Sequence, residues 1–172
     1  MKSMQRIITE RLELKRFSKI NTEQYISLIT DPNVTKYLGS GSGITQERAV
    51  EMISAFESTF GKGYGVFAVV ERASGDVIGH CGIRPIPDGR IEILYAYAPS
   101  AWGKGYATEA GLAVLKFGKE HFNLTELIAM SYPQNLGSIG VIKKLGFEHI
   151  GAEEHFGKTL ELFVMRVRAH HE

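Results

Sequence analysis

A short glycine cluster, Gly103-Lys104-Gly105, offers the clearest chemistry in this chain of 172 residues. It follows an apolar, strand-like stretch that ends near Pro99, and it precedes a stretch with helical spacing of apolar residues. The first turn of a helix has N–H groups without partners and about half a positive charge, so it can hold a phosphate. Glycines let the main chain come close enough to offer those N–H groups. From these residues alone, the cluster is either an anion site or a turn shaped by packing.

Two well-known phosphate loops fit this cluster poorly. A Walker-type loop needs Ser or Thr directly after its lysine to bind magnesium, but Gly105 follows Lys104. A dinucleotide-binding loop needs a third glycine within a strand–helix–strand unit. Here that glycine is absent and the preceding strand closes a hairpin. A kinase-like nucleotide site is therefore disfavoured.

Around the cluster, segments in which apolar residues have the spacing of a strand alternate with segments in which they have the spacing of a helix. Alternating and short apolar runs predict strands at residues 11–17, 66–70, 77–83, 91–97, 127–130, 147–150 and 160–167. Helical spacing predicts helices after the caps Asn21 and Thr45, a long helix opened by the glycine cluster, and another from Asn135 to Gly146. The second of these helices is expected to bury a stripe formed by Val50, Ile53, Phe56 and Phe60. This order predicts an α+β fold with a mixed, mostly antiparallel sheet and helices on both faces.

Five segments, in the right order and spacing, resemble the GNAT acetyltransferases, in the RimJ/RimL-like branch that acetylates protein N-termini and small amines. Trp102-Gly103-Lys104-Gly105-Tyr106-Ala107-Thr108-Glu109-Ala110 resembles that family's coenzyme A pyrophosphate loop. Residues 9–14, 31–38, 92–95 and 135–147 resemble its opening strand, the end of its first helix, its fourth strand, and its closing helix and strand. The resemblance implies a splayed sheet whose fourth and fifth strands part around the pantetheine arm.

The resemblance also implies which residues bind acetyl-CoA, the expected co-substrate. The main chains of Tyr95, Ala96 and Tyr97 are expected to follow the pantetheine arm. The pyrophosphate is expected beside Trp102, on the N–H groups of Gly103, Lys104, Gly105, Tyr106, Ala107 and Thr108. Asn135 is expected to cap its helix, to contact the coenzyme, or both. Nothing in this set calls for a metal ion.

In this family an amine attacks the thioester directly, so the protein must accept a proton and stabilise the departing thiolate. Glu92 is the candidate base, because a carboxylate in a half-buried strand can have a raised pKa; otherwise it is an exposed carboxylate near Arg90. Strand alternation places Glu92 on the face opposite Tyr95. Many relatives have an acidic tyrosine where this chain has Ile142. Ser138 is therefore the candidate donor to sulfur, or else only a first-turn residue that supports the helix cap.

Two other reactive side chains lie in the expected strand 77–83. His80 could act as a base, although a core histidine is the expected role. Cys81 is expected to be a small buried apolar residue and not a nucleophile, which disfavours a ping-pong cysteine mechanism. As the single cysteine, it also excludes a disulfide framework and a multi-thiolate metal site.

The composition restricts the partners. The 20 Lys and Arg residues against 19 Asp and Glu leave a net charge of +1, which argues against nucleic acid. No apolar run is long enough to span a membrane, and the N-terminus lacks the apolar core of a leader peptide. We therefore expect one domain, residues 1–172, located in the cytoplasm as a monomer or homodimer.

The resulting prediction is an acetyl-CoA-dependent N-acetyltransferase that acts on a primary amine, either a protein N-terminus or a small molecule. The alternative is a non-catalytic acyl-CoA-binding or regulatory module, because the family's acidic tyrosine is missing. We expect the first two helices, the loop at residues 37–43 and the last hairpin at residues 155–158 to build the acceptor site.

Overall fold

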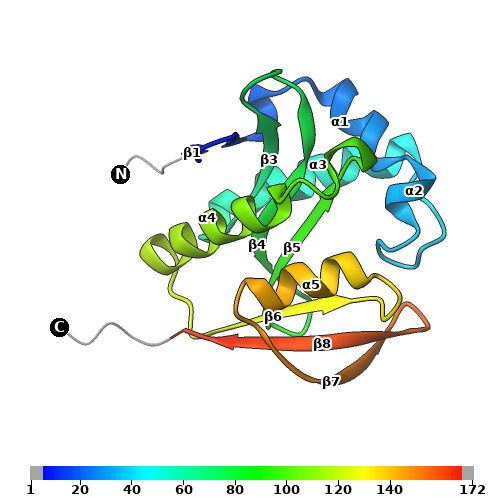
Figure 1. Ribbon diagram of the computed structural model, residues 1–172, viewed down its shortest axis with the longest axis vertical. Coiled ribbons are helices and arrows are strands. Elements are labelled where there is room, and N and C mark those ends of the chain that lie inside the picture. The colour runs from blue at the N-terminus through cyan, green and yellow to red at the C-terminus, as the bar shows by residue number, and fades with distance from the viewer. Residues whose placement is uncertain (1–5, 168–172) are drawn as a thin grey trace.

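The structure is a computed structural model that describes residues 6–167 (Figure 1). Eight strands form one sheet: β1 (Arg6–Ile8), β2 (Leu12–Lys15), β3 (Gly65–Glu71), β4 (Val77–Pro85), β5 (Ile91–Tyr97), β6 (Glu126–Ser131), β7 (Glu148–His155) and β8 (Lys158–Arg166). Their order is β1-β2-β3-β4-β5-β6-β8-β7. Neighbours run antiparallel except β5 and β6, which are parallel. The expectation of no leader peptide rests on N-terminal residues, of which the first five lie outside the described range.

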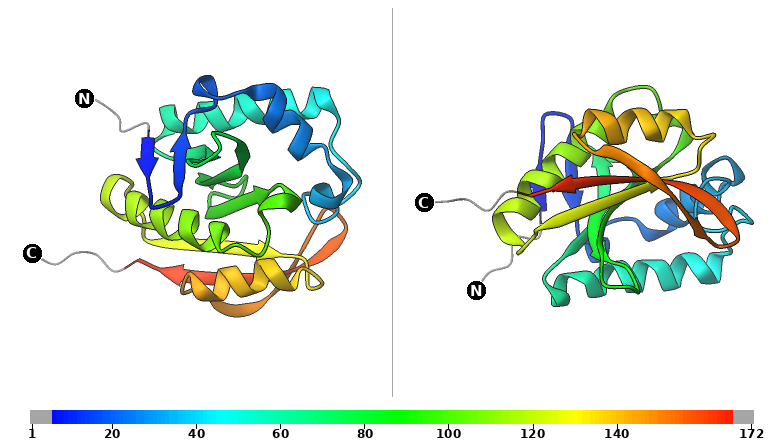
Figure 2. Two further views of the ribbon diagram at one scale, coloured as in Figure 1. Left: turned by 45° about the horizontal axis from the view of Figure 1, so that its top comes forward. Right: turned by 90° about the horizontal axis from the view of Figure 1, so that it is seen from below.

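Five α-helices connect and cover these strands: α1 (Thr22–Ile29), α2 (Pro32–Thr35), α3 (Gln46–Thr59), α4 (Tyr106–His121) and α5 (Leu136–Lys144). Three short 3-10 helices lie at Phe17–Lys19, Phe60–Lys62 and Pro99–Ala101. Helices α3 and α5 lie on opposite sides of the sheet (Figure 2). The expected α+β architecture is confirmed.

Two apolar cores fill the spaces between the sheet and its helices. On one face, Tyr25 of α1 and Phe56 of α3 pack against alternate residues of β3 such as Val66 and Ala68. On the other face, α4 and α5 pack against a larger core that includes Phe67 from the same strand. Successive residues of a strand point to opposite faces, so β3 serves both cores and is buried along nearly all its length.

The expected helix starts are confirmed by side-chain caps. Asn21 accepts a hydrogen bond from the N–H of Gln24, and Thr45 accepts one from the N–H of Arg48. The expected burial of Val50 is wrong, because its side chain is more than half exposed. Helix α3 turns Ala49 and Phe56 inwards instead, seven residues apart and therefore on one face.

The two edges of the sheet differ most from the expected elements. Strand β1 was not expected, and β7 continues to His155 instead of ending near Ile150. Most of the β7 residues are exposed, so the strand lacks the apolar alternation that marks a strand in a sequence. Its length comes from pairing with β8 across the turn at Phe156 and Gly157. Among residues 6–167, no helix has both the length and the apolar character needed to cross a bilayer.

Candidate functional site

The candidate residues gather around a gap between β5 and β6. Within residues 6–167, Glu92 and Ile128 form the single residue pair between these two strands, which then diverge (Figure 1). On its other side, β5 pairs with β4 along its whole length. One edge of β5 therefore presents peptide groups that the sheet does not use, and such groups need another partner.

The hydrogen-bond alternation of β5 decides which peptide groups face the gap. The N–H of Ala98 donates to the carbonyl of Ile78 at 2.8 Å, on the β4 side. Because hydrogen-bonding groups alternate sides along an antiparallel strand, the main chain of Ala96 also faces β4. The main chains of Tyr95 and Tyr97 face the gap. Of the three residues expected to contact the pantetheine arm through their main chains, Tyr95 and Tyr97 face the gap and Ala96 does not.

Trp102 lies at the end of the unpaired β5 edge. Its indole Nε1 donates a hydrogen bond to the carbonyl of Tyr97 at 2.8 Å, while half of its surface remains exposed. The indole therefore occupies the last carbonyl of the β5 edge and leaves the N–H of Tyr97 facing the gap.

The glycine loop opens α4 as expected. Gly103 has φ +74° and Gly105, the N-cap of α4, has φ +80°, values that residues with a Cβ rarely adopt. No side chain caps this helix within the described chain. The first helical hydrogen bond runs from the N–H of Glu109 to the carbonyl of Gly105. The N–H groups of the first turn, Tyr106 to Thr108, are therefore available to an anion.

A brace from the N-terminal segment holds this loop, and the sequence did not reveal it. The Arg11 guanidinium donates to the Glu109 carboxylate at 2.7 Å and to the carbonyl of Lys104 at 2.8 Å. Thr9 donates to the same carboxylate at 2.6 Å. Partial burial opposes ionisation, but these hydrogen bonds hold the pKa of Glu109 below its ordinary value. Arg11 and Glu109 are 98 residues apart, so no local pattern could pair them.

Glu92 lies on the face covered by α1 and α3, beside Arg84. Its side chain is 12 % exposed, and Arg84 Nε donates to its carboxylate at 3.1 Å. Burial raises the pKa of Glu92, and the neighbouring Arg84 charge and hydrogen bond only partly oppose this rise. A carboxylate with a raised pKa next to an unpaired strand edge is suited to accept a proton from an amine.

Tyr95 and Ser138 meet on the opposite face of β5. The Tyr95 hydroxyl lies 3.0 Å from Ser138 Oγ and donates to the Ser138 carbonyl at 3.1 Å. Asn135 caps α5 by accepting a hydrogen bond from the N–H of Ser138. Burial raises the pKa of Tyr95 to about 12. The structure thus joins β5 to the first turn of α5 through two hydroxyl groups, a contact that the sequence did not reveal.

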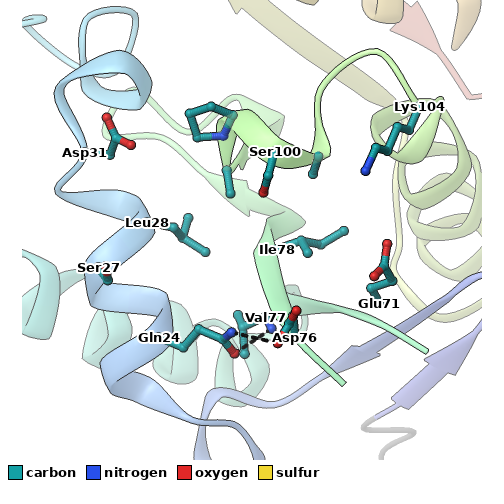
Figure 3. A pocket seen from close by; sticks show the side chains of 13 residues that line it. Gln24, Ser27, Leu28, Asp31, Glu71, Asp76, Val77, Ile78, Ser100 and Lys104 are labelled. Carbon is teal, nitrogen blue, oxygen red and sulfur yellow. Dashed lines mark hydrogen bonds between the residues drawn. The ribbon is translucent and has the colours of Figure 1, made fainter. Parts of the chain in front are cut away.

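A pocket of about 660 Å³ lies beside the segment that leads into α4 (Figure 3). It is bounded by α1, the start of β4 and the segment that leads to α4. Asp31, Glu71 and Asp76 line it, and Lys104 is the single cation among its lining residues. Three carboxylates repel a diphosphate, so this pocket is unsuited to the phosphate chemistry of the loop.

Two further contacts hold distant segments next to the ends of β6 and β5. The Tyr132 hydroxyl, just after β6, donates to the carbonyl of Gly39 at 2.5 Å and so holds the loop between α2 and α3. Arg90, just before β5, makes two hydrogen bonds of 2.7 and 2.8 Å to Glu153 of β7. His155 lies 3.0 Å from the same carboxylate. The loop between α2 and α3 is thus held at the end of β6, and β7, which leads into the last hairpin, is held next to the start of β5.

The remaining reactive side chains are buried in the core. His80 Nδ1 lies 2.8 Å from the Tyr25 hydroxyl, and burial lowers the pKa of His80 to about 3. Burial raises the pKa of the Cys81 thiol to about 12. Neither group is placed to act on a bound substrate. In the described part of the chain, no cluster of three or more His, Cys, Asp or Glu side chains could hold a metal ion.

Comparisons with known proteins identify a family whose model matches most of the chain. Residues 11–148 match the family described as an acetyltransferase (GNAT) domain. An uncharacterised N-acetyltransferase, p20 from Bacillus licheniformis, is 30% identical over 159 residues, which cover 91% of this chain and 89% of p20.

Solved structures share the fold at lower identity. An acetyltransferase from Agrobacterium tumefaciens superimposes with a TM-score of 0.82 at 22% identity, covering 97% of each chain. The ribosomal-protein α-N-acetyltransferase RimL, solved with coenzyme A, superimposes with a TM-score of 0.75 at 14% identity, covering 94% of this chain and 97% of RimL. From the family match and the p20 similarity together, this chain belongs to the GNAT family of acetyltransferases.

Proposed function

We propose that the chain transfers the acetyl group of acetyl-CoA to a primary amine by direct attack in a ternary complex. The observation that carries this proposal is the unpaired edge of β5, which leads from the uncapped N-terminus of α4 towards the largely buried carboxylate of Glu92. An extended amide-bearing arm can pair with such an edge, and a diphosphate can bind the helix start.

The proposed coenzyme contacts follow from the main chain. The diphosphate would be held by the N–H groups of residues 103–108, next to the indole of Trp102. The pantetheine arm would pair with the main chains of Tyr95 and Tyr97. Ala96 is left out of this pairing, because its peptide groups face β4. Asn135 would act by capping α5 near the sulfur end of the arm.

The proposed chemistry needs a base and a donor on opposite faces of β5. Glu92 would take the proton that the ammonium group loses, which its raised pKa favours. Ser138 would place a hydroxyl at the first turn of α5, where the helix dipole favours developing negative charge on sulfur. The whole chain, residues 1–172, would form this single catalytic domain.

The acceptor is proposed to be a protein N-terminus or a small amine, as in the RimJ/RimL-like branch. The likeness of the fold to RimL supports this branch without identifying an acceptor. The acceptor would reach Glu92 between the loop held by Tyr132 and the hairpin held by Arg90.

The test is a screen of amines and N-terminal peptides that reads thiol release from acetyl-CoA, with mass spectrometry of the products. Thiol release that depends on an acceptor, with an acetylated amine as product, is the expected result. Tight coenzyme binding without transfer to any acceptor would instead favour the acyl-CoA-binding module, an alternative raised by Ile142 at the position of the usual tyrosine.

A further inference from the structure

The hydroxyl of Tyr95 occupies a distinctive place between the two halves of the sheet. The main chain of Tyr95 faces the gap, while its ring packs on the α4 and α5 side. Its hydroxyl reaches the first turn of α5, the helix that follows β6. The phenol therefore bridges the gap at the level of α5, on the face opposite Glu92.

We propose, on the basis of the function proposed above, that Tyr95, rather than Ser138, gives its proton to the departing sulfur while the Ser138 hydroxyl donates to the phenol oxygen. The two hydroxyls are 3.0 Å apart, so the Ser138 hydroxyl can donate to the phenol oxygen while the phenol donates its own proton elsewhere. At present the phenol donates to the Ser138 carbonyl at 3.1 Å. Rotation of the O–H bond redirects that proton to a group in the gap.

Chemical reasoning favours the phenol over the aliphatic hydroxyl as the donor. A phenol titrates near 10 in water, and it releases its proton far more readily than a serine hydroxyl does. The Ser138 O–H instead stabilises the phenolate oxygen, which is why the Ser138 hydrogen bond partly opposes the rise in the pKa of Tyr95. The N-terminus of α5 stabilises the same negative charge.

The residues already described account for every proton that moves in the reaction. As the C–N bond forms and the C–S bond breaks, the sulfur takes the electron pair and the proton of Tyr95. Glu92 holds the first proton that the ammonium loses and later releases it to solvent. The second proton lost by the attacking nitrogen returns through water to Tyr95, so the net products are the amide, the free thiol and one proton.

The first measurement does not depend on turnover. The thiolate absorbance of bound coenzyme A is titrated with pH in the wild type, in Tyr95→Phe, in Ser138→Ala and in Tyr64→Phe. A donor to sulfur lowers the thiol pKa, so we expect Tyr95→Phe to raise that pKa by about 1–2, the effect of losing a hydrogen bond to a charged group. Tyr64, a partly buried tyrosine that packs on Phe122, is the control and should leave the thiol unchanged.

The second measurement is steady-state kinetics on the same variants. Tyr95→Phe should lower kcat about 100–1,000-fold, while the dissociation constant of acetyl-CoA stays near that of the wild type. Ser138→Ala should have a smaller effect, about tenfold. If the phenylalanine variant folds poorly, 3-fluorotyrosine at position 95 keeps the shape and makes the phenol more acidic, so the bound thiol pKa should fall.

The results separate this inference from the proposed function. Absence of coenzyme A binding to the wild type would overturn both. Normal binding with the same thiol pKa in wild type and Tyr95→Phe would overturn only the role of Tyr95, even if kcat fell, because a purely positioning residue would behave in that way. A large kcat loss in Ser138→Ala with little loss in Tyr95→Phe would assign the proton to Ser138 instead.

Discussion

At the scale of single residues, the proposed role of Glu92 as the base can be tested through the pH dependence of the reaction. Because burial raises its pKa and only the ionised form accepts a proton, kcat/KM should fall as pH drops through that raised value. Arg84→Met removes the charge that lowers this pKa, so the acid limb should move to higher pH. Glu92→Gln should lower kcat about 100-fold or more with coenzyme affinity unchanged.

The measurement is a pH profile of acetyl transfer for the three proteins, with Glu148→Gln as an exposed control on β7. An unchanged profile in both Arg84→Met and Glu92→Gln would place the base elsewhere.

Gly105 tests the anion site at the scale of one residue. Gly105→Glu puts a side chain and a negative charge where the diphosphate is proposed to bind, so acetyl-CoA affinity should fall at least about 100-fold. Gly63→Glu is the matched control, because Gly63 has nearly the same backbone (φ +82° against +80°) and open space around it, but lies far along the chain. Calorimetric titration with acetyl-CoA measures both affinities. Equal losses of affinity in the two variants would mean that backbone strain, and not the lost anion site, causes the effect.

The buried residue His80 is expected to make the stability of the fold depend on pH. Its pKa falls to about 3 in the folded protein, against about 6.5 in an unfolded chain, so the unfolded state binds the extra proton between these values. Stability should therefore be full above about pH 6.5 and decline on acidification by about 1.4 kcal/mol per pH unit.

The test compares urea unfolding of the wild type and His80→Asn between pH 4 and pH 7. The variant should be less stable at neutral pH, because it loses the contact with Tyr25, yet its free energy of unfolding should depend less steeply on pH. Parallel pH curves for the two proteins would contradict this account.

At the scale of elements, the brace between the N-terminal segment and α4 sets the loop geometry. Glu109→Ala removes the partner of Arg11, which also holds the Lys104 carbonyl. Loss of this support should weaken acetyl-CoA binding about tenfold, or about 1.4 kcal/mol. Glu120→Ala, an exposed glutamate on the same helix, should leave the dissociation constant unchanged. Equal affinities in the two variants would mean that the loop holds its shape without the brace.

At the scale of the whole molecule, the described residues join the two parts of the sheet through one backbone pair, a shared apolar core and side-chain contacts such as that of Arg90. Arg90→Met removes the two hydrogen bonds to Glu153, together with one to Asp88, and should lower the free energy of unfolding by about 1–2 kcal/mol. Arg48→Met removes a surface ion pair to Glu51 on α3 and should cost under about 0.5 kcal/mol. Chemical denaturation of both variants measures the difference, and similar values would show that the hairpin contact adds nothing to the joint.

Features that depend on neighbours in sequence were predictable from the sequence. The caps Asn21 and Thr45, the glycine loop ahead of α4, and the opposite faces of Glu92 and Tyr95 all follow from local spacing, and the structure has them. Local periodicity was less informative where an element is exposed, as at Val50 and along β7.

Contacts between distant segments were decided by the tertiary structure. Arg11 meets Glu109 across 98 residues, and Tyr95 meets Ser138 across 43. The unpaired edge of β5, and the turn of the Ala96 main chain away from it, depend on how the strands pair. The spacing of residues along a chain determines which side chains share a face, but only the packing of whole elements brings two such faces together.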